Sequence, residues 1–382
     1  MKSKGRALRV MLVANDGFSA GHVVRALSVA RGLAREGARR GLEVALLLAT
    51  TSEVEGLGFE GVAVMRLPAP VAARRAGVND GERRRLVAAA LDSVGHAFAP
   101  DLLVVDTFPS GPHGEVGGLL GASLRVRRAL IRRDVPVDRA EDPAVVRGLA
   151  RYDLVVVADD PVRVQDADVL AGLNAAGRGP RVVHVPPVTL SEAEEGADRA
   201  TARARLELPR DGRAVLVAAG GGGDLEAVAR ARDIAATLAK IASDVLVVLA
   251  IGPLGSGDSG DFREMGAGRA RVVRVAPMQP WLAAFDGAIA AAGYNTAHEL
   301  AKARVPCALF AQVRPFDDQA ARVRRFVEAS LAFGLERFDE GALRQALVWM
   351  QGAPHAGLPA GGADHAAAAL LDLACAGWAG AP

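Results

Sequence analysis

The segment ALRVMLVAN, residues 7–15, is a short apolar run rich in Val and Leu that leads into an Asn-Asp-Gly turn. The segment HVVRALSVARGLAREGARRG, residues 22–41, then repeats its apolar residues at helical spacing and ends at a glycine. A short apolar run bounded by turn residues predicts a buried strand, and the spaced pattern predicts a helix. The chain therefore begins with strand, loop and helix, the unit from which parallel α/β sheets are built.

The same alternation continues through the first half of the chain. A helix is predicted over residues 80–98. Further strands are predicted at residues 42–50, 62–67, 101–108, 152–160 and 181–185. Because these runs are continuously apolar, they indicate a parallel sheet that is covered by helices on both faces.

A polar and charged stretch at residues 188–204 separates this half from a second alternation of strands and helices. We place a domain boundary there, with an amino-terminal domain over residues 1–190 and a carboxy-terminal domain over residues 191–360. The second half contains predicted helices at 224–240 and 296–304 and predicted strands at 214–220, 244–252, 271–277, 287–293 and 306–312.

The expected architecture is α/β, with two Rossmann-like parallel-sheet domains facing across a cleft. Ligands of such sheets bind beyond the carboxyl ends of the strands, so functional residues are expected in the loops that follow strands. A Gly/Pro joint near residue 358 leads into a last Ala/Leu-rich helix at residues 364–378.

Composition excludes several classes of protein. The chain has 46 Lys and Arg against 44 Asp and Glu, and a net charge of +2 argues against a general nucleic-acid binder. The two cysteines, Cys307 and Cys375, form no disulfide framework and no zinc-binding pattern, which favours a reducing, cytoplasmic setting. The first ten residues lack the apolar segment of a signal peptide, and no apolar run reaches the roughly 18 residues of a membrane span.

Two basic clusters lie in the predicted amino-terminal domain: GERRRL at residues 81–86 and RVRRALIRR at residues 125–133. Clusters of this kind are candidates for peripheral contact with the anionic inner face of a membrane. The other interpretation is that they are solvated faces of helices.

The loop after the first strand, NDGFSAGH at residues 15–22, contains the first candidate site residues. Gly17 and Gly21 allow a ligand to approach the backbone closely, and the following helix offers its first N–H groups. A His at the mouth of a cleft is suited to take a proton from an attacking hydroxyl, so His22 is the first candidate for a general base. The other interpretation is a helix-capping or packed His.

The loop after the strand at 101–108 reads DTFPSGPHGEV, residues 106–116. Asp106 ends that strand and is expected to orient a base or an acceptor hydroxyl, or to serve as the second candidate for the base. A simple turn or helix cap is the other interpretation. His113 and Glu115 are further candidates on the acceptor side.

Four consecutive glycines, Gly220, Gly221, Gly222 and Gly223, separate a predicted strand from a predicted helix. The segment lacks the Lys and Ser/Thr of a P-loop and the GxGxxG spacing of a dinucleotide site. It is interpreted as a main-chain cradle for a phosphate or a sugar, with a flexible turn as the alternative.

The segment AAAGYNTAHELAKARVP, residues 290–306, is a second strand-to-helix junction. Asn295 and Thr296 precede a helix whose first N–H groups are suited to hold a phosphate. Glu299 lies one turn further along, where a carboxylate is spaced to accept two hydrogen bonds from a ribose diol. His298 is interpreted as a structural neighbour of this turn.

The segment RPFDDQAARVRR, residues 314–325, enters another helix. Asp317, Asp318 and Gln319 carry groups that hydrogen-bond sugar hydroxyls. Helix N-capping is the other interpretation for one of the two aspartates. Because Asp317 and Asp318 are adjacent, the sequence does not exclude a metal at this position.

These motifs together resemble the GT-B fold glycosyltransferases of family 28, which include the lipid II-forming N-acetylglucosaminyltransferases. The resemblance is carried by GFSAGHVVRALSVARGL at residues 17–33, by the glycine-rich loop, and by AAGYNTAHELAKARVPCALFAQVRPFDDQAARV at residues 291–323. The segment at 101–160 looks closer still to a bacterial set of predicted glycosyltransferases related to that family.

The resemblance implies that the carboxy-terminal domain binds a nucleoside-diphosphate sugar, linked to UDP or dTDP. It puts Glu299 on the ribose, the Gly220–Gly223 loop and the Asn295–Thr296 helix start near the diphosphate, and Gln319 on the donor sugar. Asp318, next to Gln319, is a further candidate for donor binding. Met278 and Gln279, in the loop APMQPW, fall where the family holds the base. The resemblance also implies that the last helix packs back on the first domain, and that His22 faces the acceptor.

The expected chemistry is direct displacement at the anomeric carbon, with helix dipoles and backbone N–H groups stabilising the leaving nucleotide. Neither a metal nor a cofactor is expected. The acceptor carries a hydroxyl or an amine and is of unknown class: a small molecule, a glycan or a lipid-linked compound. Two alternatives stay open: a nucleotide-sugar hydrolase or epimerase of the same fold, and a non-catalytic nucleotide-sugar-binding subunit.

Overall fold

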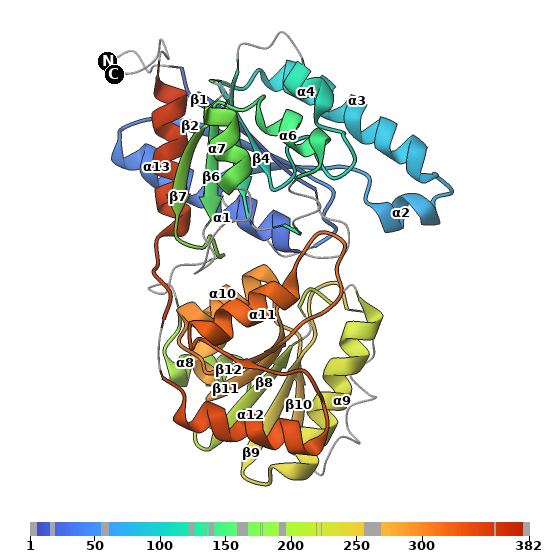
Figure 1. Ribbon diagram of the computed structural model, residues 1–382, viewed down its shortest axis with the longest axis vertical. Helices are drawn as coiled ribbons and strands as arrows, with labels where there is room; N and C mark the ends of the chain where they lie inside the picture. Colours follow the sequence, from blue (N-terminus) through green and yellow to red (C-terminus); the bar gives the residue numbers. More distant parts are fainter. Residues whose placement is uncertain are drawn as a thin grey trace. The chain divides into compact units, whose positions relative to one another are not determined.

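A computed structural model describes most of the chain and divides it into two compact units (Figure 1). Unit 1 consists of Met1–Glu53, Gly58–Val188 and Gly361–Pro382, and unit 2 of Val54–Leu57 and Thr189–Ala360. The described residues are 6–15, 20–54, 61–121, 126–133, 135–136, 141–158, 167–175, 177, 179–190, 196–218, 220–222, 224–255, 269–354 and 357–376.

The described strands of unit 1 form one parallel sheet in the order β3-β2-β1-β4-β5-β6-β7. They are β1 (Leu8–Ala14), β2 (Val44–Thr50), β3 (Val62–Arg66), β4 (Leu102–Asp106), β5 (Arg127–Arg132), β6 (Leu154–Ala158) and β7 (Arg181–Val185). The chain order reverses at β1, which lies between β2 and β4. Val13 pairs with Val105 across β1 and β4, so the loops that follow these two strands leave the sheet side by side.

Helices cover both faces of this sheet. Helices α3 (Asp80–Phe98), α4 (Gly117–Gly121), α6 (Pro143–Leu149) and α7 (Ala167–Ala175) contribute to one apolar core, and α2 (Pro70–Arg75) packs on α3. On the other face α1 (Gly21–Arg39) packs against β1 and β2, and α13 (Gly362–Cys375) packs against β5, β6 and β7. Strand side chains alternate between the faces, so apolar residues throughout a strand supply both cores.

The last helix, α13, lies beside α1 in unit 1 (Figure 1). The two backbones approach closely at Gly32, where a Cβ would lie 2.6 Å from the carbonyl oxygen of Ala363. Arg35 also pairs with Asp364 at 2.7 Å. Gly32 lets α1 and α13 approach closely, and the ion pair between Arg35 and Asp364 lies beside this contact. The last helix is therefore part of the same unit as the first.

The described strands of unit 2 form a second parallel sheet in the order β10-β9-β8-β11-β12-β13. They are β8 (Arg213–Ala218), β9 (Val245–Ala250), β10 (Ala270–Val273), β11 (Gly287–Ala291), β12 (Cys307–Phe310) and β13 (Phe333–Gly334). The order reverses at β8, which lies between β9 and β11. The loops after β8 and β11 are therefore the ones expected at a ligand site.

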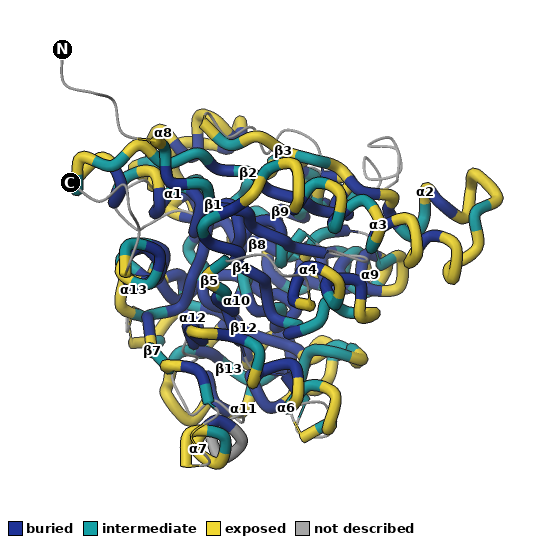
Figure 2. The backbone as a smooth tube through the Cα atoms, turned by 90° about the horizontal axis from the view of Figure 1, so that it is seen from above, coloured by how far each residue is buried: buried dark blue, intermediate teal, exposed yellow. Residues whose placement is uncertain are grey.

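Helices again cover both faces of the second sheet, and Figure 2 shows its central strands buried. Helices α9 (Leu225–Ile241) and α12 (Glu340–Gly352) pack on one face. The other face carries α8 (Arg199–Arg205), the short 3₁₀ helix η3 (Gln279–Ala284), α10 (Tyr294–Lys302) and α11 (Gln319–Glu328). The predicted fold class, two parallel-sheet α/β domains, is confirmed.

The interpretation of the basic cluster at residues 125–133 as an exposed helix face is wrong for residues 129–133, which are buried, whereas Arg127 is exposed. Most of the cluster is β5, which lies in the sheet between β4 and β6. Arg132 is 1% exposed and donates from Nη1 to the carbonyl oxygen of Thr107 at 2.7 Å. The cluster at 81–86 lies in α3, where Arg83 is buried and its neighbours are exposed. None of the helices in the described part of the chain has both the length and the apolar character that a bilayer crossing requires.

Candidate functional site

The carboxyl ends of β1 and β4 bring together His22 and Asp106. His22 is the second residue of α1, and Asp106 is the last residue of β4. The Nδ1 atom of His22 lies 2.5 Å from Oδ2 of Asp106. The two residues that the sequence named as first and second candidate bases are therefore one hydrogen-bonded pair.

The charge state of Asp106 decides which partner donates. Burial works to raise the pKa of this carboxyl, but the Arg25 charge and the bonds from His22 and Arg25 outweigh burial and hold the pKa well below its usual range. An ionised carboxylate only accepts hydrogen bonds, so Nδ1 of His22 carries the proton and donates it. In the neutral ring Nε2 is then the basic nitrogen. Asp106 orients His22 and is unsuited to act as a base itself.

Arg25 is a component of this cluster that sequence reasoning missed. Its side chain is 1% exposed, with Nε 2.7 Å from Oδ1 of Asp106 and Nη2 2.7 Å from Oδ2. Nη2 also donates to the hydroxyl of Thr107 at 2.7 Å. The available signal was an Arg three residues after His22, inside the apolar run of a predicted helix, where a charge requires a buried partner.

Thr107 has an unusual backbone, with φ of 60°, a value rare for a β-branched residue. Its N–H donates to the carbonyl oxygen of Ile131 at 2.7 Å, and its own carbonyl oxygen accepts from Nη1 of Arg132. Such a conformation costs about 1–3 kcal/mol and persists only where surrounding contacts fix it. Here it brings the Thr107 hydroxyl to Arg25.

The three residues predicted on the acceptor side, Gly21, His113 and Glu115, have different surroundings. Both carboxylate oxygens of Glu115 are used internally: Oε1 accepts from Asn15 Nδ2 and Oε2 from the N–H of His113, each at 2.7 Å. Glu115 therefore braces its own loop against β1. The side chain of His113 is exposed, and Gly21 begins α1. Residues 16–19 of the first loop lie outside the described residues.

The glycine-rich loop after β8 packs on the loop after β9. The N–H of Leu254 donates to Gly221 at 2.9 Å, and a Cβ on Gly222 would lie 2.6 Å from the nitrogen of Gly255. Gly220 and Gly222 have φ of 85° and 84°, which favours glycine. Close approach of two backbones therefore accounts for Gly222. Gly223 lies outside the described residues.

Helix α10 begins at Tyr294, two residues before the predicted start at 296. Asn295 and Thr296 are consequently in its first turn instead of preceding it. Gly293 is the N-cap residue and supplies no side-chain cap, and the first turn contains no acidic residue. The positive end of the helix dipole is therefore not neutralised by an acidic side chain of its own first turn.

Two buried side chains fix the start of α10. Arg322 is fully buried and donates from Nη1 to the carbonyl oxygen of Ala292 at 2.8 Å. His298 bonds through Nδ1 to the carbonyl oxygen of Tyr294 at 2.6 Å, and the two rings lie 4.2 Å apart. The predicted structural role of His298 thus has a specific contact, whereas Arg322 was missed.

The loop before α11 uses both of its aspartates internally. Asp317 pairs with Arg322 at 2.9 Å, and Oδ1 of Asp318 caps α11 by accepting from Ala321 at 2.9 Å. Gln319 is 4% exposed; its Oε1 accepts from the N–H of Gln312 at 3.0 Å, and its Nε2 donates to Asp317 at 3.2 Å. The geometry gives Asp318 the capping role and gives Gln319 the role of holding the loop.

Met278 and Gln279 follow β10. Met278 precedes η3, and its carbonyl oxygen accepts from Trp281 at 2.9 Å. Gln279 is buried, at 5% exposed. Their place after a strand of the second sheet is the one predicted.

Glu299 differs from the carboxylate that the sequence suggested. It is half-buried on α10, its carboxyl accepts from the N–H of Leu190, and Lys302 is close enough to act on it. Burial outweighs both effects and raises the pKa of Glu299 to about 8. The group is therefore mostly protonated at neutral pH in the ligand-free chain, and it offers one O–H donor as well as acceptor positions.

This raised pKa predicts a pH-dependent stability. The folded state holds a proton on Glu299 that the unfolded chain, with an ordinary pKa of 4.5, releases, so stability falls as pH rises from 4.5 through about 8. Full linkage would amount to about 5 kcal/mol. Partial exposure reduces the expected loss to about 2 kcal/mol. Urea unfolding across this pH range measures it.

The matched comparison for this prediction is Glu299→Gln against Glu226→Gln, because Glu226 is 83% exposed on α9. The free energy of unfolding of Glu299→Gln should fall less steeply with pH than that of the parent chain, while Glu226→Gln should follow the parent. Identical slopes for all three proteins would rule out a proton held on Glu299.

Comparison with known proteins identifies the fold. No protein-family model matches the chain, and no curated protein matches its sequence significantly. Three solved structures illustrate the structural matches. Os79 from O. sativa in complex with UDP aligns with a TM-score of 0.62 at 14% identity, covering 96% of this chain and 94% of that chain.

Medicago truncatula UGT71G1 complexed with UDP-glucose aligns with a TM-score of 0.59 at 14% identity, covering 98% of this chain and 100% of the other. Spinosyn rhamnosyltransferase SpnG complexed with thymidine diphosphate aligns with a TM-score of 0.56 at 20% identity, covering 97% and 96%. The chain therefore has the two-sheet GT-B fold of these proteins over nearly its whole length.

Proposed function

We propose that the protein is a glycosyltransferase that moves a sugar from a UDP- or dTDP-linked donor to a hydroxyl or amine acceptor. The observation that carries this proposal is the hydrogen-bonded pair of His22 and Asp106. The pair lies at the carboxyl ends of β1 and β4, where the strand order of the first sheet reverses. A His whose Nδ1–H is held by a buried carboxylate presents Nε2 as a base, which is what activation of an acceptor hydroxyl requires. The UDP, UDP-glucose and thymidine diphosphate complexes of proteins with this fold support the class of donor.

Unit 2 is the proposed donor-binding unit. The start of α10, with Asn295 and Thr296 in its first turn, is assigned to the diphosphate, because N–H groups and the helix dipole favour an anion there. We assign the main chain of the Gly220–Gly222 loop to the same group and Glu299 to the ribose. Met278 and Gln279 are assigned to the base. These assignments follow the family 28 resemblance, which remains part of the proposal.

The donor sugar has fewer assigned contacts. Oδ1 of Asp318 caps α11, and we assign its second carboxylate oxygen to a sugar hydroxyl. Gln319 is left out of direct contact, because both ends of its amide are engaged within the loop. The sugar itself is not assigned.

The reaction is a direct displacement at the anomeric carbon. Nε2 of His22 takes the proton of the acceptor hydroxyl as that oxygen bonds to the anomeric carbon. The bond from the anomeric carbon to the diphosphate breaks, and the nucleoside diphosphate leaves with the electron pair. Its charge is stabilised by the N–H groups at the start of α10, and the proposal needs no metal. The free thiols Cys307 and Cys375 suit a reducing compartment, and we place the reaction in the cytoplasm.

Nucleotide release tests the proposal. Purified protein is incubated with UDP- and dTDP-sugars, with and without extracts containing hydroxylated acceptors, and free nucleotide is measured by chromatography. Release that requires the acceptor, together with a glycosylated product, supports transfer. Release without acceptor would assign a hydrolase instead, and donor binding without any turnover would assign a binding subunit. Heat-denatured protein supplies the background rate.

A further inference from the structure

We infer that Arg25 and Thr107 are positioning residues that hold His22 in the tautomer with its proton on Nδ1. The inference rests on the proposed function, in which Nε2 of His22 is the base. It concerns the hydrogen bonds around Asp106, all of which lie within unit 1.

The guanidinium of Arg25 fixes the orientation of the Asp106 carboxylate. Nε donates to Oδ1 and Nη2 donates to Oδ2, each at 2.7 Å. Two parallel bonds of this kind fix the plane of a carboxylate as well as its position. Oδ2 is thereby held 2.5 Å from Nδ1 of His22.

The same guanidinium also presents a competing arrangement. Nη2 of Arg25 lies 3.2 Å from Nδ1 of His22. If Nδ1 were unprotonated, it would be able to accept a hydrogen bond from that nitrogen. The ring would then carry its proton on Nε2 and would have lost its basic position toward an acceptor.

Thr107 removes this competitor. A guanidinium nitrogen of the Nη type carries two hydrogens, and those of Nη2 go to Oδ2 of Asp106 and to the hydroxyl oxygen of Thr107, each at 2.7 Å. Both of these bonds are shorter than the 3.2 Å contact between Nη2 and Nδ1 of His22, so the hydrogens of Nη2 are directed mainly to the two oxygens. Nδ1 then donates to Oδ2, which leaves Nε2 as the basic nitrogen.

The backbone conformation of Thr107 directs its hydroxyl toward Arg25. Its φ of 60° is an uncommon conformation for Thr, and the N–H and the carbonyl oxygen are anchored to Ile131 and Arg132. The hydroxyl in turn donates to Oδ2 of Asp106 at 3.1 Å. Thr107 is fully buried, so water does not compete for the hydroxyl.

Nitrogen NMR of the full-length chain tests the inference without any substrate. The chain contains seven histidines, and ¹⁵N-histidine labelling with long-range proton–nitrogen spectra distinguishes protonated from unprotonated ring nitrogens. His22 is assigned by the loss of its signals in His22→Gln. In the parent protein the neutral ring of His22 should show a protonated Nδ1 and an unprotonated Nε2.

Two substitutions of the same residue separate the hydroxyl from the fold. Thr107→Val keeps the branched shape but frees one hydrogen of Nη2, so the Nε2–H tautomer of His22 should become populated. Thr107→Ser keeps the hydroxyl and should retain the parent pattern. Unchanged signals from the other histidines show that each variant is folded.

A second variant, Arg25→Lys, keeps the positive charge but lacks the planar fork. It should also mix the two tautomers of His22. With donor and acceptor, Thr107→Val and Arg25→Lys should lower kcat about 10-fold to 100-fold with little change in the donor KM, because a wrongly protonated base is lost from the reactive population.

The two proposals fail separately. If His22 keeps the parent nitrogen pattern in both Thr107→Val and Arg25→Lys, the positioning role is overturned whatever the rates. If the tautomer changes in these variants but transfer does not depend on His22, the positioning role stands and the assignment of the base is wrong. If either Thr107→Val or Arg25→Lys does not fold, the nitrogen pattern of the other variant decides the positioning role.

Discussion

Replacing His22 with Ala is expected to lower kcat for sugar transfer about 100-fold to 10,000-fold, because the acceptor hydroxyl loses its base. Donor affinity should be unchanged, because the residues assigned to the nucleotide lie in unit 2, whereas His22 lies in unit 1. Initial rates at saturating donor and calorimetric titration with the nucleoside diphosphate measure the two quantities. A kcat within about twofold of the parent would remove His22 from the chemistry.

This substitution is informative because it should not unfold the protein. Without His22, Asp106 still accepts two bonds from Arg25 and is not left as an unpaired buried charge. The melting temperature should therefore stay close to that of the parent. His22→Gln provides a second variant that preserves polarity but supplies no base.

Asp106→Asn is the matched variant for the other half of the pair. It keeps the shape of the side chain but replaces an obligate acceptor with a group that has both a donor and an acceptor. A loss in kcat approaching that of His22→Ala is expected, because orientation of the ring and its tautomer depend on this carboxylate. Asp106→Ala is a poorer choice, since it removes both carboxylate acceptors of the buried Arg25, whereas Asn keeps one carbonyl oxygen.

The sequence predicted the sheets well where strands are continuously apolar. β1, β4 and β6 are buried along almost their whole length, and their composition alone indicates this. β5 was missed because Arg residues surround its Ala, Leu and Ile. Arg132 is buried, and the carbonyl oxygen of Thr107, in the neighbouring loop, accepts one of its hydrogen bonds. That partner is visible only once the strands are paired.

Candidate residues were found individually, whereas their relationships required the fold. His22 was selected because it ends the loop after a strand, and Asp106 because it ends a strand, but the sequence does not reveal that β1 and β4 are neighbours. Arg25 and Asp106 lie 81 positions apart along the chain. The two aspartates at 317 and 318 looked equivalent, and the start of α11 decides that the second is its cap. Local patterns therefore identify elements and loops, while buried charge pairs depend on distant contacts.

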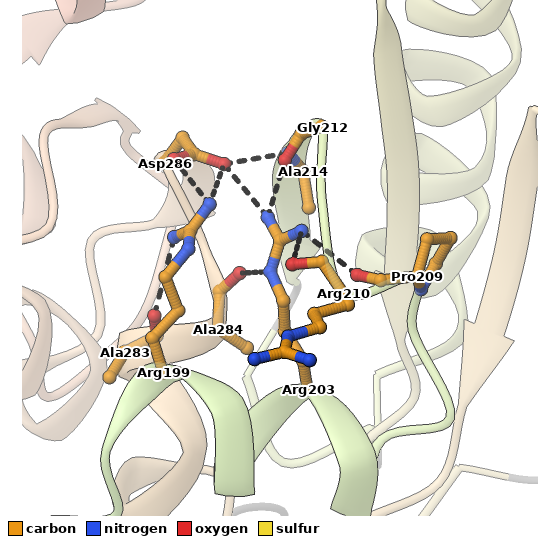
Figure 3. A network of polar contacts seen from close by, with 9 residues as sticks. All are labelled: Arg199, Arg203, Pro209, Arg210, Gly212, Ala214, Ala283, Ala284 and Asp286. Carbon is orange, nitrogen blue, oxygen red and sulfur yellow. Dashed lines mark hydrogen bonds and ion pairs between the residues drawn. The ribbon is translucent and has the colours of Figure 1, made fainter.

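Arg203 is expected to contribute strongly to the stability of unit 2. It lies on α8, is 2% exposed, and directs all five of its N–H groups to acceptors (Figure 3). Four are carbonyl oxygens and one is a carboxylate oxygen, at 2.7–3.2 Å: those of Pro209, Arg210, Gly212, Ala284 and Asp286. The side chain thus joins α8 to the loop before β8 and to the end of η3.

Arg203→Met should destabilise unit 2 by about 3–5 kcal/mol, because methionine fills the volume of the stem but takes this donor away from the four carbonyl oxygens, whereas Asp286 still accepts from Arg199 and from the N–H of Ala214. Arg203→Lys should lose less, since an ammonium group has three donors. Urea unfolding followed by tryptophan fluorescence measures the change, because Trp281 and Trp349 both lie in unit 2.

Arg199 supplies the matched control, because it is one turn away on the same helix and pairs with the same Asp286, at 2.8 Å (Figure 3). Its side chain is 44% exposed, so water replaces the lost contacts and Arg199→Met should cost only about 0–1 kcal/mol. The difference between the two losses in unfolding free energy therefore measures what burial and the carbonyl hydrogen bonds of Arg203 contribute. The attraction to Asp286 is common to both variants. Equal losses would mean that the ion pair carries the stability and that the four carbonyl contacts of Arg203 add nothing.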